Sequence, residues 1–104
     1  MSEDSLQIVY VDQTTLRQRF NSLDYYGQVR RGELTPVVYW SKLAPPSAGQ
    51  PAGTLSQFVH YRRGPTEVAR VHQYRRIDGT LGASGLPDPK WNRDGDTILM
   101  LAPR

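Results

Sequence analysis

Residues 55–77 hold the side chains of this sequence that are best suited to bind a charged ligand. Five arginines stand there against a single acid, Glu67, although the whole chain of 104 residues has a formal charge of only +3. Rings alternate with cations along the second half of the segment, in the order Arg70, His72, Tyr74, Arg76. Guanidinium groups bind phosphate through two bonds, and aromatic rings stack on nucleobases. The segment therefore predicts an anionic partner, and nucleic acid is the partner we expect first.

Two strands around the turn "RGPT" must position these side chains, one over residues 55–62 and one over 67–77. With a four-residue loop, Arg62 lies opposite Glu67 in a favourable pair of charges. Successive residues then point to alternate faces. The face predicted to pack on the core carries Phe58, His60, Ala69, Val71, Gln73, Arg75 and Ile77. The face predicted to meet solvent carries Gln57, Val59, Tyr61, Val68, Arg70, His72, Tyr74 and Arg76.

The solvent face supports three functional hypotheses beside the plain one of a solvated surface. A small binding or accessory protein would contact nucleic acid there. A metal-independent ribonuclease would use the same face, with Arg stabilising phosphoryl charge and His or Tyr moving protons. A protein-interaction subunit or homodimer would bury these Arg and Tyr side chains in an interface. The candidate anion-binding residues are Gln57, Tyr61, Arg70, His72, Tyr74 and Arg76.

Several chemistries are not expected. The predicted register places His60 and His72, the two histidines, on opposite faces, so they cannot share a metal unless the strands slip by one residue. The chain has no cysteine, which excludes a disulfide, a thiolate zinc site and a cysteine nucleophile. No GxSxG motif accompanies its serines and histidines. We therefore predict no catalytic residue, no metal site and no cofactor.

The rest of the sequence predicts a small α+β domain spanning residues 1–104. Further strands are expected over residues 6–11, 35–43 and 96–101. Asp12 can cap an amphipathic helix over 13–26, which ends at Gly27 or runs on to Arg31 with Gly32 as its stop. The architecture is then a mostly antiparallel sheet of four to six strands with one main N-terminal helix packed on it.

Two segments rich in Gly and Pro are expected to be loops. Residues 44–53 lack large apolar side chains and should be a mobile internal loop. Residues 78–95 contain "GTLGASG", whose backbone amides could form an anion-binding nest, but a turn followed by an irregular crossing is the simpler interpretation. The acidic start "MSEDSLQIVYVD" lacks the bases of a signal peptide and is too short to span a membrane, which favours a cytoplasmic protein.

The segment "VHQYRRIDGTLGASGLPDPKW", from Val71 onward, resembles one found in short uncharacterised bacterial proteins of phage or plasmid type. That resemblance implies no activity for particular residues. The closing "RDGDTILMLAPR" is similar to the last strand of ribosome-dependent toxins of the RelE type, which implies the ribonuclease alternative. Those toxins have paired N-terminal helices, whereas this sequence predicts an opening strand and a single helix.

Overall fold

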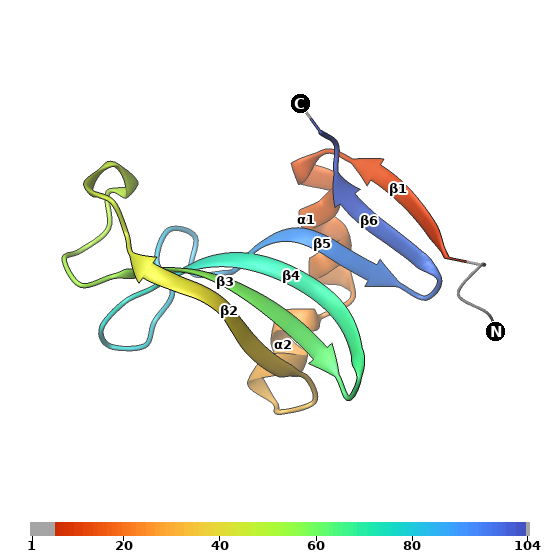
Figure 1. Cartoon of the computed structure of the whole chain (residues 1–104), viewed down its shortest axis with the longest axis horizontal. Coiled ribbons are helices and arrows are strands. Elements are labelled where there is room, and N and C mark those ends of the chain that lie inside the picture. Colours follow the sequence, from red (N-terminus) through yellow and green to blue (C-terminus); the bar gives the residue numbers. More distant parts are fainter. Residues whose placement is uncertain (1–5, 104) are drawn as a thin grey trace.

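A six-stranded sheet in the order β1-β6-β5-β4-β3-β2 forms the body of the computed structural model, which describes residues 6–103 (Figure 1). Its strands are β1 (Gln7–Val11), β2 (Thr35–Leu43), β3 (Leu55–Arg63), β4 (Thr66–Arg75), β5 (Asp88–Asp94) and β6 (Thr97–Leu101). β1 runs parallel to β6, and the other neighbouring strands are antiparallel. The predicted α+β class and the mostly antiparallel sheet are confirmed.

The predicted N-terminal helix is two helices, α1 (Gln13–Ser22) and α2 (Tyr25–Arg30). As predicted, Asp12 caps α1, because its carboxylate accepts a hydrogen bond from the Thr15 backbone N–H at 2.7 Å. The single helix over 13–26 is wrong, because Asp24 adopts a left-handed conformation (φ 53°) that no helix can continue through.

The two glycines considered as helix ends have different roles. Gly27 lies inside α2, where a Cβ would come within 2.2 Å of the Asp24 carboxylate. Its missing side chain therefore lets the chain turn tightly between the helices. Gly32, with φ +80°, follows the last residue of α2 and its C-cap Arg31, so it is the left-handed stop.

Both helices cover the same face of the sheet and bury the core against it (Figure 1). Phe20 of α1 and Tyr25 of α2 pack edge to face, with ring centroids 6.2 Å apart. Burying a large apolar side chain contributes about 1.5–3 kcal/mol, so this cluster fixes which face the helices occupy. Its buried members are Phe20, Tyr25, Leu34, Val59, Tyr61, Val68, Ala69 and Val71.

The predicted loop over 78–95 is too long, because β5 occupies its second half. Pro89 conceals this strand in the sequence, since proline lacks an N–H for the ladder. Pro89 is tolerated because the pairing of β5 with β4 is irregular at this position. The register of the two strands shifts there, between Arg70 and Val71 of β4. Residues 78–87 remain a connection, and only Leu81 among them makes a bridge to β4, at Arg75.

The loop over residues 44–53 contains a short 3-10 helix (Pro46–Ala48) and is closed at its base by the Ala44 N–H, which donates to the Thr54 carbonyl at 2.9 Å. Its mobility stays a prediction. No helix within residues 6–103 is long and apolar enough to cross a membrane. The acidic residues that begin the chain, up to Ser5, lie outside the described part.

Candidate functional site

A bulge in the β3–β4 hairpin changes the predicted faces. Arg62 pairs with Glu67, as predicted, but Tyr61 pairs with Ala69, so Val68 is an extra residue on β4. Every pair further along the hairpin is shifted by one residue relative to the prediction. His60 therefore lies opposite Arg70 instead of Ala69, and His72 lies opposite Phe58 instead of Gln57. A one-residue shift exchanges the two faces of a strand.

The bulge moves two predicted site residues into the core. Tyr61 is 1% exposed and packs on Phe20, with ring centroids 6.1 Å apart, and burial raises the pKa of its hydroxyl. Gln57 is buried and bonds to the Ser41 hydroxyl and to the Gln73 amide. Their assignment to a solvent face is wrong, as is that of Val59 and Val68.

The bulge also moves residues of the predicted core face to the opposite side of the sheet. Ala69 and Val71 are buried there, as predicted, but Phe58 and His60 point to the other side of the sheet. They follow the alternation of β3, in which Val59 and Tyr61 occupy the core positions.

Three of the six predicted site residues, Arg70, His72 and Tyr74, do lie on the side of the sheet away from α1 and α2. The Arg70 side chain is 40% exposed, whereas His72 and Tyr74 are half-buried. Arg76 follows the last residue of β4, and its Nε is buried without a hydrogen-bond partner among the described residues. Arg76 is therefore not part of the same strand face.

We call this uncovered side of the sheet the open face. The register places rings from five strands on it, whereas the remaining rings lie on the side that the helices cover. Sequence reasoning confined to the hairpin missed the contributions of β1, β2 and β5. The rings of the open face are Tyr10, Tyr39, Trp40, Phe58, His60, His72, Tyr74 and Trp91.

A second bulge brings two consecutive aromatic residues of β2 onto the open face. The register shifts between Val38 and Trp40, so Tyr39 is the extra residue. Its ring stacks on His60 with centroids 4.4 Å apart and 9° between the planes. Trp40 lies parallel to Phe58, with centroids 6.2 Å apart and 10° between the planes. Alternation alone would have sent one of these two rings to the core side.

Cations lie directly over rings of the open face. The Lys42 Nζ is 5.3 Å from the Trp40 ring, and the Arg70 guanidinium carbon is 4.9 Å from the Trp91 ring. Such cation–π contacts hold the charge while leaving its outer N–H groups free for other acceptors. Glu67 orients two neighbours, through its bonds to Arg70 Nε at 2.5 Å and to His60 Nδ1 at 3.0 Å.

Because of the first bulge, His60 and His72 share the open face, and their predicted separation is wrong. The His72 Nε2 lies 2.7 Å from the Ser56 hydroxyl. Burial, followed by the nearby Lys90 charge, lowers the pKa of the His72 ring, which is therefore neutral at pH 7. Within residues 6–103 no group of three or more His, Asp and Glu side chains could hold a metal ion.

The lowered pKa of His72 predicts that the protein loses stability in mild acid. Between the ordinary value of 6.5 and the lower folded value, the unfolded chain binds a proton that the folded ring does not. The free energy of unfolding should therefore fall as the pH drops through this range. In urea titrations, the stability difference between wild type and His72→Gln should change with pH below 6.5 and be constant above neutrality. An NMR titration midpoint of the His72 ring at or above 6.5 would contradict the prediction.

Fold and open face together define a class of protein: a small α+β domain whose sheet presents rings and cations on the side without helices. Among known proteins, no family model, no curated protein and no solved structure matches this chain.

Proposed function

We propose that this protein binds single-stranded nucleic acid on the open face of its sheet. The observation that carries the proposal is that eight rings, with cations in contact with them, lie on the one side of the sheet that no helix covers. Stacking on aromatic side chains requires bases that are not already stacked in a duplex, which favours single strands.

The arrangement of the rings supports a strand lying across the sheet. Tyr39 and Trp40 on β2 are followed by rings on β3 and β4 and by Trp91 on β5, so successive bases can find successive rings. Tyr39 is 70% exposed and Trp40 is 41% exposed, so part of each ring is open to solvent beside its stacked neighbour. Lys42 and Arg70 flank the rings where the phosphates of such a strand would pass.

The salt dependence of binding tests the electrostatic part of the proposal. Each phosphate contact that is lost should lower the slope of log affinity against log salt by about one unit. Lys42→Gln and Arg70→Gln should each do so and should weaken binding to all sequences alike. The measurement is fluorescence anisotropy of a short labelled single strand across a salt series.

Arg19→Gln is the matched control. Arg19 lies on α1, on the covered side, where it forms an ion pair with Asp94. Its replacement should leave the slope unchanged. If the wild-type protein shows no salt-dependent binding of single-stranded DNA or RNA at micromolar concentration, the proposal fails. Self-association through the exposed edge strand β2 would then be the better account of the uncovered rings.

A second candidate function is metal-independent RNA cleavage, because the observed register brings His60 and His72 onto the face that carries Arg70. A neutral His72 can accept a proton, and Arg70 can stabilise charge on a phosphoryl group. RNA that is shortened in the presence of a chelator by the wild type, but not by His72→Gln, would support this candidate. RNA that stays intact would contradict cleavage and leave nucleic-acid binding as the one proposed function.

A further inference from the structure

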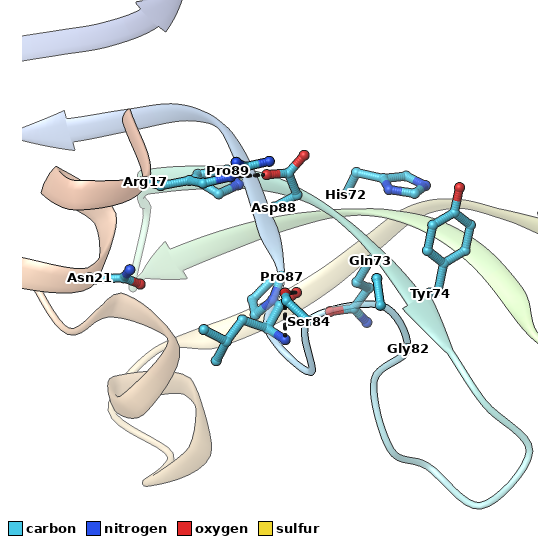
Figure 2. Close-up of a pocket in the computed structure, with 12 residues that line it drawn as sticks. Arg17, Asn21, His72, Gln73, Tyr74, Gly82, Ser84, Pro87, Asp88 and Pro89 are labelled. Carbon is cyan, nitrogen blue, oxygen red and sulfur yellow. Dashed lines mark hydrogen bonds and ion pairs between the residues drawn. The ribbon is translucent and has the colours of Figure 1, made fainter. Parts of the chain in front are cut away.

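A cavity of about 410 Å³ opens where β4 continues past the start of β5 (Figure 2). The pairing of these two strands begins at His72 and Asp88, so β4 from Gln73 onward has no strand beside it on this edge. Residues 82–87 of the long connection pass across the gap and form the far wall, and α1 closes the side nearer the core. We call this cavity the loop pocket.

The loop that forms the wall is held in place by its backbone. The Gly82 N–H donates to the Tyr74 carbonyl at 2.7 Å, and the Gly85 N–H donates to the Gly82 carbonyl at 3.1 Å. A Cβ at Gly82 would come within 2.1 Å of the Gln50 side chain, so a glycine allows this close approach. The loop pocket is thus formed before any ligand arrives, which lowers the entropic cost of binding.

Two rings of the open face also line the loop pocket. His72 and Tyr74 meet edge to face with centroids 4.8 Å apart, and both residues line the cavity, with the Tyr74 ring on the opposite side of β4 from the Gln73 side chain in Figure 2. Leu86, Pro87 and Pro89 add apolar surface. A flat aromatic ligand can stack against such walls, and it would reach them directly from the open face.

The polar groups of the loop pocket suit a base and its phosphate. The Arg17 Nε bonds to Asp88 at 3.0 Å, which fixes the guanidinium and leaves its terminal N–H groups to donate elsewhere. The side-chain amide of Asn21 has no hydrogen bond to any described residue, although it lines the cavity. The amide of Gln73 faces the same space and bonds to Gln57 through its nitrogen only.

From these features we propose that the loop pocket holds one nucleobase of the single strand that the open face binds, a proposal that rests on the function proposed above. The base lies against Leu86 and Pro87, the amides of Asn21 and Gln73 bond to its edge, and Arg17 contacts the adjoining phosphate. Amide groups both donate and accept, so they discriminate between base edges. The pocket therefore supplies a base preference that the stacking rings of the open face do not.

Competition by homopolymers of the four bases against a labelled strand tests this proposal. Wild-type protein should prefer one base. Asn21→Trp, which fills the pocket from an exposed helix position, should abolish the preference and lower the salt slope by no more than about one unit, the contribution of the Arg17 phosphate contact. Asn21→Ala, which removes one amide and favours the helix, should reduce the preference roughly two- to tenfold. Gln18→Trp is the control, because Gln18 is exposed on α1 away from the cavity and should keep the preference intact.

The outcomes separate the pocket from the open face. Two results would overturn the proposal for the loop pocket and leave binding by the open face standing. One is equal affinity of the wild type for all four homopolymers, and the other is an unchanged base preference in Asn21→Trp. If the wild type binds no strand, the proposed function fails, and free mononucleotides then test the pocket alone. On adding a mononucleotide, NMR shifts confined to residues that line the loop pocket, Asn21 and Gln73 among them, would support the pocket, and their absence would overturn it.

Discussion

Replacing Tyr61 with Ala is expected to lower the free energy of unfolding by about 3–5 kcal/mol, as for other large aromatic side chains in a core. Tyr61 is 1% exposed and contacts Phe20 of α1, so its removal leaves a cavity where helix and sheet meet. For a domain of this size each kcal/mol corresponds to roughly 4–8 °C in the midpoint of thermal unfolding. Thermal and urea unfolding followed by circular dichroism measure the effect.

Tyr39→Ala is the matched control for this prediction. Both tyrosines lie in strands, but Tyr39 is 70% exposed on the open face and stacks on one neighbour, His60. Its loss should cost less than about 1 kcal/mol. If Tyr61→Ala does not fold at all, Tyr61→Phe, which retains the ring, should fold with nearly wild-type stability. A Tyr61→Ala protein as stable as the wild type would mean that the hairpin lacks the bulge and that Tyr61 faces solvent.

Trp40→Ala is expected to weaken the binding of single-stranded nucleic acid by about 1–3 kcal/mol, the usual contribution of one stacked base. This corresponds to roughly 5- to 150-fold in the dissociation constant. Trp40 is 41% exposed, and both Phe58 and Lys42 hold its ring in place. Since stacking releases no counterions, the salt slope should stay at its wild-type value, unlike the result expected for Lys42→Gln.

Leu43→Ala controls for changes in the edge strand itself. Leu43 belongs to β2, is 68% exposed and carries no ring, so its replacement should leave the affinity unchanged. Equal losses in Trp40→Ala and Leu43→Ala would show that the strand, and not the ring, matters for binding. Wild-type affinity in Trp40→Ala would contradict stacking at this position.

Local patterns in the sequence were enough to predict most of the elements. The Asp12 cap and the pairing of Arg62 with Glu67 each depend on residues close together in the chain, and both are present. Gly32 was one of two helix ends that the sequence left open, and the structure has the stop there. The excess of Arg between residues 55 and 77 also pointed to the hairpin that contributes Arg70, His72 and Tyr74 to the open face. These features depend on interactions between residues that are close together in the chain, so they can be predicted from the sequence.

Which face each side chain occupies was decided by the tertiary structure. A bulge needs no glycine or proline to mark it, so neither Val68 nor Tyr39 could be recognised as an extra residue from the sequence. Likewise β5 could be recognised only once its partner strands were in place, because Pro89 argues against a strand locally. The sequence by itself determined most of the elements, though not β5 or the division between α1 and α2, and it determined the charge of the hairpin. Only the packing of the helices on Tyr61 and Val59 decided that the rings of the other face stay uncovered, because burying apolar surface stabilises a single register.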